Sequence, residues 1–401
     1  MRKHVSPPGH WNWRIPVAHR HGTRRGRLMF VGGQADLDAA GNVNNAGDRA
    51  RQTDACMQHV ATVVEALGGR VEDIVKLNVF YVAGTLDDEI ALLRQIRRHV
   101  RAEPPPVISL VALPRLAYPG MAVTIDALAL ANSDGKAPRM AAAPAQFSQG
   151  IRCGELLLVA AQTARDASGR IRHLDDIASQ AQLTIDNIGR VLDALGADLD
   201  DVVKLSTWYV GFGTDEDWRR AARIRSEAFR FPGPGATGVP APGRYPDGGL
   251  IRQECWAMRG TDGARLPWSL SWPKGHWDWP MRVTFQQGVK VGELIFLGGQ
   301  YACDVKGNAQ APEEREAQTR ITMDFIKSVL AGFGATMDDL VKTTCFYKSD
   351  GTPGALHANL AIRSGYFSSP AAATTSVPLM TMGLEGLMLE IEGIAVLGSR
   401  A

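Results

Sequence analysis

Residues 288–300 read GVKVGELIFLGGQ, and the chain contains this stretch three times in related forms. The earlier copies are GTRRGRLMFVGGQ at residues 22–34 and GIRCGELLLVAAQ at residues 150–162. In each copy a glycine opens the stretch, a second glycine follows four residues later and an apolar run comes next, a pattern that predicts a short β-hairpin. Because a repeated unit determines the whole architecture, the rest of the chain has to be compared copy by copy.

The repeat extends well beyond the hairpin. Lys76 and Lys204 are separated by the same interval as the glutamines that end the first two hairpins, so these two copies align without a gap. The interval from Lys204 to Lys342 likewise equals that between the second and third glutamines, and it is slightly longer than the first interval. We therefore predict three copies of one domain, with a short insertion before the third hairpin. The predicted domains span residues 1–135, 136–260 and 261–401.

The copies share one order of expected elements, which is clearest in copy one. After the hairpin, apolar residues at helical spacing and a terminal Gly68 predict a helix. A β-rich run, a second helix, a proline-rich break and two further strands follow. The expected helices of copy one are at residues 47–67 and 87–100, and the expected strands after the hairpin are at residues 74–81, 107–113 and 121–130. Each copy therefore reads ββαβαββ, an α+β unit with one sheet and two helices on one face.

Two linkers join the copies, at residues 131–145 and 259–274. A Gly-His-Trp-x-Trp motif precedes the hairpins of copies one and three, at residues 9–13 and 275–279, whereas copy two has APRMA at residues 137–141. Segments rich in tryptophan either cap a domain or form a flat wall of a ligand site. Three similar sheets in one chain favour a closed threefold arrangement, with sites between the copies.

The composition indicates a globular protein without nucleic acid or membrane as a partner. The chain has 401 residues, 45% of them hydrophobic, and a net charge of +2, which excludes the basic surface of a nucleic-acid-binding protein. The sequence contains no apolar signal region and no apolar stretch of membrane-spanning length, so we expect a cytoplasmic location. The five cysteines are widely spaced without a CxxC motif, which predicts buried reduced thiols and neither a disulfide framework nor a cysteine metal site.

Four recurring segments carry a family resemblance. They are the GELIFLGGQ hairpin, the Gln-Thr pair at residues 52–53 and 318–319, the Asp-hydrophobic-Val-Lys entry to the third strand, and LEIEGIA at residues 389–395. Together they resemble the RidA/YjgF family of enamine/imine deaminases. The resemblance covers nearly the whole chain, three times over.

The resemblance implies an α+β fold of three tandem RidA-like (chorismate-mutase-like) ββαβαββ domains. These would form a single-chain pseudo-trimer around a central β-barrel, with the helices outside and ligand clefts between copies. The implied activity is that of a hydrolase or deaminase, without cofactor or metal, that acts on a small enamine, imine or related C–N compound. The alternative is a non-catalytic RidA-like protein with a small-molecule-binding or regulatory role. RNA cleavage, an activity linked to the family's name, is disfavoured by the near-neutral charge. One chain that supplies the whole pseudo-trimer would be a monomer or a dimer.

The family's carboxylate-binding arginine is missing from all three copies. It should follow the proline that starts the fifth strand, where the copies instead have segments that contain Ser109, Thr237 and Thr374. A bidentate bond from arginine to a carboxylate contributes about 1.5 to 3 kcal/mol and fixes orientation. Ser109 and Thr374 remain candidates for substrate binding, and Arg219 or Arg252 of copy two could replace the missing anchor.

The family's catalytic-type glutamate corresponds to Glu390 of copy three. Copy one has Thr124 at this position and copy two has Arg252, so a single boundary between copies keeps the acid. Glu390 lies two residues before Glu392, an acid that the other copies share, and therefore faces the same side of its strand. If Glu390 is buried, its pKa rises towards neutrality and it suits proton transfer. The alternative is a solvated strand carboxylate.

The family's wall tyrosine corresponds to His19, Phe147 and Phe285 in the three copies. The phenylalanines are candidates for a cleft wall or for core packing. In copy one His19 and His21 should share one strand face, where either could act as general base or ligand anchor, unless both are merely solvated. Adding His10 would permit a three-histidine metal site, but no spacing requires one, and we predict no metal.

The small residues before each repeated glutamine complete the candidate site. The pairs Gly32-Gly33 and Gly298-Gly299 match a backbone segment that lines the family's cleft. Glycine allows a ligand to approach backbone amides, which then stabilise an oxyanion; the alternative is close strand packing. On the second helix the family has a cleft asparagine, whose place is taken by Ala91, Arg219 and His357, and we count His357 as an auxiliary group.

Overall fold

The computed structural model describes residues 2–132, 147–241, 243–368 and 370–398. Copy one contains β1 (Arg2–Val5), β2 (Gly22–Arg25), β3 (Leu28–Gln34), α1 (Arg49–Ala66), β4 (Ile74–Val82), α2 (Leu86–Arg97), β5 (Val107–Leu113) and β6 (Val123–Leu130). Copy two contains β7 (Gly150–Cys153), β8 (Leu156–Gln162), α3 (Ile177–Ala194), β9 (Val202–Val210), α4 (Asp215–Glu227), β10 (Gly235–Ala241) and β11 (Ile251–Met258). Copy three contains β12 (Trp268–Ser271), β13 (Gly288–Val291), β14 (Leu294–Leu297), α5 (Arg315–Ala331), β15 (Leu340–Lys348), α6 (Gly354–Ser364), β16 (Ala373–Leu379) and β17 (Leu389–Val396). A 3₁₀ turn precedes the β-rich strand of each copy, at η1 (Val71–Asp73), η2 (Leu199–Asp201) and η3 (Met337–Asp339).

Each copy forms one sheet, and the predicted ββαβαββ order is confirmed in all three. The strand orders are β1-β2-β3-β6-β4-β5, β10-β9-β11-β8-β7 and β12-β13-β14-β17-β15-β16. The pairs β4–β5, β9–β10 and β15–β16 are parallel, because a helix connects the two strands of each pair. Copy two has five strands, since no counterpart of β1 or β12 pairs with β7 among the described residues.

The repeated glycines have two separate structural reasons. Those in the hairpin turns, Gly26, Gly154 and Gly292, have φ between +57° and +65°, a conformation that glycine adopts at little cost. The glycine that opens each hairpin lies under a helix: a Cβ at Gly22 would come within 2.5 Å of Val63 on α1. The stretch recurs because it both turns tightly and lets the first helix approach the sheet.

The first helix of each copy covers the sheet as its apolar spacing predicts. Helix α1 begins after Asp48, whose side chain accepts a hydrogen bond from the amide of Arg51, and it ends before Gly68, which has φ +84°. Its buried face packs on β3 and β6. Helix α3 packs in the same way on β8 and β11.

Two edge strands were not predicted. β12 lies inside the segment that we expected to be a linker at residues 259–274, and it pairs antiparallel with β13. Its counterpart β1 pairs with β2. Both strands are short and lie far from their partners in sequence, so a local pattern provides little signal for them. The other expected linker, at residues 131–145, and the APRMA segment at residues 137–141 fall almost wholly outside the described residues.

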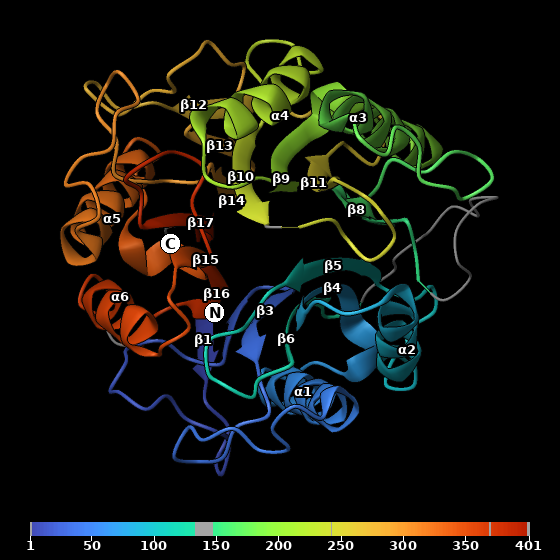
Figure 1. Cartoon of the computed structure of the whole chain (residues 1–401), viewed down its shortest axis with the longest axis vertical. Helices are drawn as coiled ribbons and strands as arrows, with labels where there is room; N and C mark the ends of the chain where they lie inside the picture. The colour runs from blue at the N-terminus through green and yellow to red at the C-terminus, as the bar shows by residue number, and fades with distance from the viewer. Residues whose placement is uncertain (1, 133–146, 242, 369, 399–401) are drawn as a thin grey trace.

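The three copies contact each other in a cycle. β5 lies beside β8, β10 beside β14, and β16 beside β3, and we call these contacts the 1–2, 2–3 and 3–1 boundaries. Figure 1 shows the three copies around a common centre, with strands towards the middle of the view and helices towards its rim. The expected central barrel is not formed by the described residues, because the strands make three separate open sheets. At each boundary a single bridge joins the copies, such as the one between Arg20 and Ala373.

A ring of three buried ion pairs ties the copies together at this centre. Each pair joins the lysine of a β-rich strand to the shared acid of another copy, at distances of 2.5 to 2.8 Å. The pairs are Lys76–Glu254, Lys204–Glu392 and Lys342–Asp126. They surround a cavity of about 50 Å³. The shared acids therefore have a structural role, because loss of one partner leaves a buried charge uncompensated.

Two further expectations concern the chain as a whole. All five cysteines are buried, as predicted. Within the described residues, no helix combines the length and the apolar character that a membrane span requires.

Candidate functional site

Glu390 is a buried carboxyl group at the 2–3 boundary. It lies on β17, and its residue is 4% exposed. Burial raises its pKa to about 8, against the opposing effect of Lys204 and Arg225. The group is packed so closely against the segment after β14 that a Cβ at Gly299 would lie 1.7 Å from Oε1 of Glu390. This carboxyl is therefore largely protonated at neutral pH and can both give and take a proton.

Arg225 lies near Glu390 and was not predicted as a site residue. It comes from α4 of copy two and is 2% exposed. Its Nε donates to the carbonyl of Ala221 at 3.0 Å, whereas its Nη1 has no partner among the described residues. The guanidinium lies 5.7 Å above the ring of Phe285 from copy three. Burial lowers the pKa of Arg225 to about 10, so the side chain stays charged at neutral pH.

The matching arginine of copy three is held by neutral side chains. Arg363, which occupies the equivalent position, donates from Nε to Asn359 at 3.0 Å, from Nη1 to Thr374 at 3.1 Å and from Nη2 to Ser376 at 3.0 Å. These three acceptors fix the guanidinium between α6 and β16. Arg363 thus has internal hydrogen bonds in three directions.

Copy two has lost all three of these acceptors. The positions of Asn359, Thr374 and Ser376 are occupied there by Ala221, Ala236 and Gly238. A Cβ at Gly238 would come within 2.8 Å of Nη2 of Arg225, so the guanidinium already uses the space of the missing side chain. The same substitutions that shorten these side chains leave Arg225 a buried cation with a free donor. A carboxylate is the natural partner for such a group.

The 1–2 boundary has a different arrangement, because Arg252 is already paired. It takes the place of Glu390 and binds the carboxylate of Glu89 at 2.9 and 3.1 Å. Its guanidinium also lies 4.2 Å from the centre of the Tyr245 ring, and Tyr81 donates a hydrogen bond to Glu89. Although burial opposes it, Glu89 and Asp247 raise the pKa of Arg252. A carboxylate ligand would have to compete with Glu89, so Arg252 is not a free anchor.

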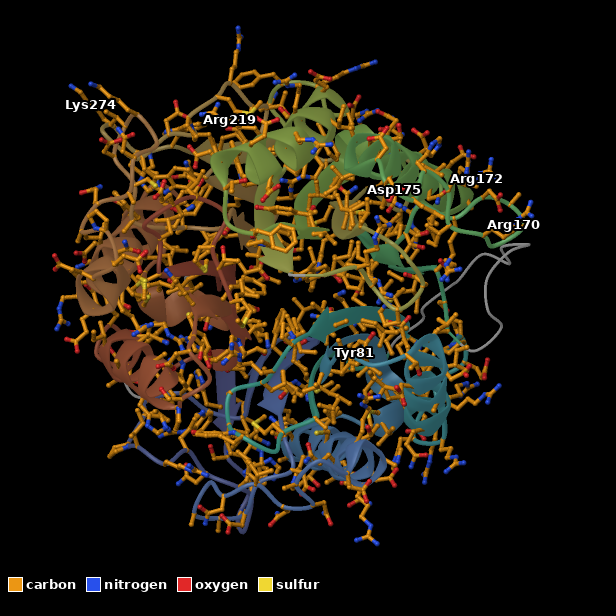
Figure 2. The ribbon with its side chains drawn as sticks, in the orientation of Figure 1. Tyr81, Arg170, Arg172, Asp175, Arg219 and Lys274 are labelled. Atoms are coloured by element: carbon orange, nitrogen blue, oxygen red, sulfur yellow. The ribbon has the colours of Figure 1, made fainter. Side chains whose placement is uncertain are left out.

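Arg219, the other arginine that we considered as an anchor, is bound to a backbone carbonyl of copy three. Its side chain donates to the carbonyl of Pro280 at 3.2 Å and is only partly buried. Figure 2 shows Arg219 towards the rim of the molecule, whereas Tyr81 lies further towards the interior. The sequence left open which arginine replaces the family's carboxylate-binding arginine. Arg225, further along α4, is a better candidate than Arg219.

The 3–1 boundary contains His19 and His357 but no acid at the position of Glu390. Nδ1 of His19 donates to the carbonyl of Ala372 at 2.9 Å, and its Nε2 has no partner among the described residues. Burial, followed by the charge of Arg363, lowers the pKa of His19 to about 3. Such an imidazole is neutral and weakly basic at neutral pH. His357 interacts with the hydroxyl of Tyr118 at 3.1 Å.

His21 lies in other surroundings than His19, although we expected the two imidazoles to share a face. Its ring stacks on Trp13 at 4.7 Å and meets the edge of His10 at 4.4 Å. The third imidazole of this group is His59 on α1, at 4.5 Å from His10. The described residues contain no group of three histidine, cysteine or acidic side chains arranged to hold a metal ion.

The glycine pairs line the boundaries, but most of their amides are occupied. The amide of Gly298 donates to Gln287 and that of Gly299 to Ala236, both at 2.9 Å. The amide of Gly32 donates to His21 at 2.7 Å. Glycine at these places is explained by close packing, since a Cβ at Gly32 would lie 2.6 Å from the carbonyl of Thr374. These three amides are therefore not free to bind an oxyanion.

The remaining candidates lie at separate boundaries. Ser109 accepts a hydrogen bond from the amide of Ala161 at 3.1 Å, which places it at the 1–2 boundary. Phe147 is buried in the core of the same region, and Thr374 holds Arg363 at the 3–1 boundary. Of the phenylalanines, Phe285 is the one in contact with an unpaired buried arginine.

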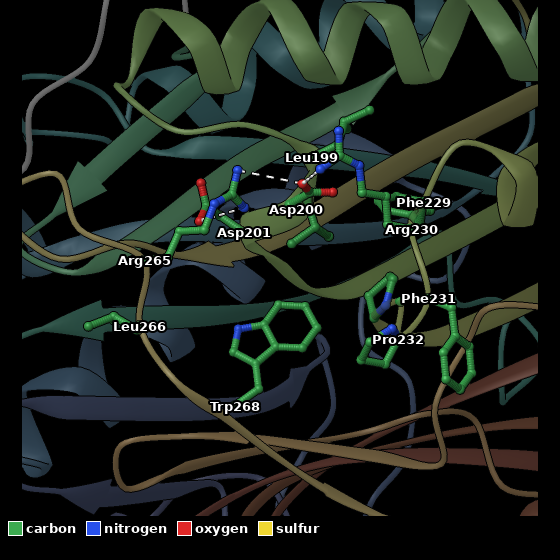
Figure 3. Close-up of a pocket in the computed structure, with 13 residues that line it drawn as sticks. Leu199, Asp200, Asp201, Phe229, Arg230, Phe231, Pro232, Arg265, Leu266 and Trp268 are labelled. Atoms are coloured by element: carbon green, nitrogen blue, oxygen red, sulfur yellow. Dashed lines mark ion pairs between the residues drawn. The ribbon is translucent and has the colours of Figure 1, made fainter.

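A separate surface hollow lies away from these boundary residues. It has a volume of about 280 Å³ and lies between the entry to β10 and the start of β12. Figure 3 shows the side chains that line it, among them Trp268 and Phe231. Its arginines, Arg230 and Arg265, form ion pairs with Asp200 at 3.3 and 3.5 Å. Its charges are thus neutralised by each other, and it contains none of the groups expected to react.

Comparison with known proteins gives a consistent result for all three copies. The family model described as Endoribonuclease L-PSP matches residues 16–131, 137–241 and 280–397. A RutC family protein of Saccharolobus solfataricus is 30% identical over 111 residues, which are 28% of this chain and 85% of the relative. A 2-iminobutanoate/2-iminopropanoate deaminase of Dermatophagoides farinae is 30% identical over 115 residues, with 28% and 85% covered. Among solved structures, a chorismatase matches with a TM-score of 0.53 at 14% identity, over 81% of this chain and 93% of that protein, which is a likeness of fold.

Proposed function

We propose that this chain, which belongs to the Endoribonuclease L-PSP (RidA/YjgF) family through all three of its copies, hydrolyses a small 2-imino acid at the 2–3 boundary. One observation carries the proposal: Glu390, with a pKa of about 8, lies near a buried arginine that has no ion-pair partner among the described residues. Within the described part of the chain, neither of the other boundaries combines such an acid with such a cation. The named activity of the Dermatophagoides relative, on 2-iminobutanoate and 2-iminopropanoate, agrees with this choice of substrate.

Arg225 binds the substrate carboxylate in this proposal. Arg225 takes the role of the family's carboxylate-binding arginine, which is missing from the fifth strand. It reaches the 2–3 boundary from helix α4. The absence of the three internal acceptors in copy two favours this role, because Nη1 of Arg225 has no partner among the described residues and can donate to a carboxylate. The ring of Phe285 provides an apolar surface below the guanidinium. Together they orient the imine group towards Glu390.

Glu390 carries out the proton transfers. In its protonated form it gives its proton to the imine nitrogen, and the resulting carboxylate takes a proton from water as the water oxygen bonds to the imine carbon. The carboxyl then protonates the nitrogen of this carbinolamine and accepts the proton of its hydroxyl group, which leaves an oxyanion. The C–N bond breaks as the carbonyl forms. Ammonia and a 2-oxo acid leave, and Glu390 is again protonated.

The pKa of about 8 suits this sequence of steps, because a group close to neutrality gives and takes protons with similar ease. General acid–base catalysis by one such group contributes about 10² to 10⁴-fold, which is sufficient for a reactive imine. The low pKa of His19 and His21 makes them poorer bases for this reaction. A polynucleotide substrate is disfavoured, because Glu390 and Arg225 are both buried.

The test is the release of 2-oxo acid and ammonia from imines generated in situ by an amino-acid oxidase from a panel of amino acids. We expect the wild-type protein to accelerate hydrolysis and Glu390→Gln to abolish the acceleration. Thr124→Val at the equivalent position of copy one is the matched control and should retain activity. If no imine in the panel is hydrolysed faster, the proposal is wrong. Binding of 2-oxo acids without turnover would then favour a binding or regulatory protein.

A further inference from the structure

The proposed reaction passes through an oxyanion, and the backbone amides of the glycine pair after β14 are not free to stabilise it. Those of Gly298 and Gly299 already donate to carbonyl groups. A catalytic site that develops negative charge on oxygen needs a donor fixed in place beforehand. A side chain near Glu390 with an unused hydrogen-bond donor would meet this requirement.

Tyr301 has such a donor. Gln300 and Ile391 exchange both of their backbone hydrogen bonds, at 2.8 Å each, as an antiparallel pair does. Tyr301 and Glu390 flank this isolated bridge on the two segments, and a charge on Glu390 adds to the effect of burial in raising the pKa of Tyr301. Tyr301 is 5% exposed, and its hydroxyl has no partner among the described residues.

The Gly-His-Trp-Asp-Trp segment at residues 275–279 fixes this tyrosine. The ring of Trp277 lies 4.1 Å from the ring of Tyr301. Nε1 of Trp277 and Nε2 of His276 both donate to the side-chain oxygen of Gln300, at 3.1 and 2.8 Å. The segment therefore holds both the tyrosine ring and the residue before it. This gives the repeated tryptophan motif a function in copy three that the hairpin alone does not explain.

The other two copies lack the phenol group that this arrangement positions. The corresponding residues are Ala35 in copy one and Thr163 in copy two. In copy one Trp11 also donates to Gln34, at 3.1 Å. The same tryptophan–glutamine contact is therefore present there without a tyrosine beside it. The tyrosine, the protonatable glutamate and the unpaired arginine thus occur together at one boundary only.

We propose that Tyr301 is a further catalytic residue, whose hydroxyl donates a hydrogen bond to the oxyanion while Glu390 moves the protons. This inference rests on the proposed imine hydrolysis. The hydroxyl keeps its proton throughout, because burial raises the pKa of Tyr301 well above 10. No bond to Tyr301 forms or breaks. Trp277 is a positioning residue, since it acts through the tyrosine ring.

The test compares Tyr301→Phe with Tyr347→Phe in the same imine assay. Both substitutions remove one buried hydroxyl that has no partner among the described residues and leave the ring in place, but Tyr347 belongs to the 3–1 boundary. We expect Tyr301→Phe to lower kcat about 100-fold, the usual effect of one oxyanion donor, with KM changed little. Tyr347→Phe should keep the wild-type kcat. Equal rates for wild type and Tyr301→Phe, or equal losses in both variants, would overturn the inference.

A spectroscopic measurement separates this inference from the proposed function. The carbonyl stretch of ¹³C-labelled pyruvate bound to the protein should shift to lower frequency in the wild type and lose that shift in Tyr301→Phe. If the wild type hydrolyses no imine but shows this difference, imine hydrolysis fails and the donor role of Tyr301 stands. If no such difference is found, Tyr301 is only a packing residue.

The tryptophan segments supply a second matched pair. Trp277→Leu and Trp11→Leu remove the same buried ring from equivalent segments, so both should lower the thermal midpoint of unfolding. Only Trp277→Leu should also lower kcat, because only Trp277 holds a tyrosine. Equal effects on kcat would show that the segment has no positioning role.

Discussion

Replacing Glu390 by glutamine should stabilise the protein at alkaline pH, which is the opposite of what loss of an ion-pair partner would do. The pKa of Glu390 is about 8 in the folded protein, against an ordinary value of 4.5. The folded state therefore keeps a proton that the unfolded state loses between these two values. Stability from this group is fully present below the lower value and is lost as the pH rises towards the higher one.

The size of the effect follows from the two pKa values. Between about pH 5 and about pH 9, this single group lowers the free energy of unfolding of the wild type by about 4 kcal/mol, at roughly 1.4 kcal/mol per pH unit while the two states differ by one proton. Glutamine does not titrate. The difference in unfolding free energy between Glu390→Gln and the wild type should therefore grow in favour of the variant by this amount over the same range.

Urea titrations at both pH values measure this difference directly. Glu293→Gln is the control, since it removes the same charge from an exposed position on the hairpin of the same copy. Its difference from the wild type should change little with pH. If the difference for Glu390→Gln is also constant from about pH 5 to about pH 9, Glu390 titrates normally and its role in proton transfer loses its physical basis.

The other predictions concern activity and assembly. Because the resting form is protonated Glu390, kcat/KM should be level below neutrality and fall as the pH rises through about 8; a rate that rises through this range would contradict the proposed order of proton transfers. Arg225→Met should raise KM about 10 to 100-fold, the loss of one charge-assisted bond, whereas Arg97→Met at the equivalent position of copy one should not change it. Gly238→Ser should raise KM as well, since it restores an internal acceptor and displaces the guanidinium; an unchanged KM would argue against Arg225 as anchor. Lys76→Met should lower the free energy of unfolding by about 3 to 5 kcal/mol, because it leaves the buried Glu254 unpaired. Calorimetry at neutral pH measures this loss, and a much smaller value would contradict the structural role of the ion pair.

The repeat in the sequence was sufficient for most of the fold. The matching intervals between equivalent lysines and glutamines predicted three copies, and the glycines of the hairpins predicted turns that the structure contains at Gly26, Gly154 and Gly292. The expectation of a central barrel came from the family resemblance and not from the residues. Neighbouring sheets can be joined by a continuous ladder of backbone hydrogen bonds or by single bridges. Which of the two forms depends on how whole copies pack against each other, and local sequence patterns do not determine that packing.

Glu390 could be identified from the sequence because a single position distinguished copy three from the others. Arg225 could have been found by the opposite criterion, since an arginine occurs at its position in all three copies, as Arg97, Arg225 and Arg363. Its importance, however, depends on what its neighbours have lost. The acceptors that hold Arg363 come from α6 and β16, and their absence around Arg225 becomes visible only when the helix and the strand are placed together.

Tyr301 could not be identified by comparing the three copies, because the equivalent positions are occupied by Ala35 and Thr163. Its position across from Glu390 follows from the pairing of Gln300 with Ile391, and that pairing is isolated from the main ladder of β14 and β17. The backbone amides of Gly298 and Gly299 were the natural prediction from glycine alone. They are excluded as donors by hydrogen bonds to other parts of the chain, which include copy two.

Fusion of three copies into one chain explains why the boundaries differ while the centre is the same. In a trimer of identical subunits, any substitution appears at all three boundaries at once. Here each boundary has its own residues: an arginine paired to Glu89 at the first, an unpaired arginine with Glu390 at the second, and an arginine held by neutral side chains at the third. A lysine–acid pair is present at each of the three boundaries, where it joins two neighbouring copies. Among the described residues, only the 2–3 boundary combines a buried acid of raised pKa with a buried arginine that has no ion-pair partner, so under the proposed function the other two boundaries can stabilise the assembly without keeping a catalytic site.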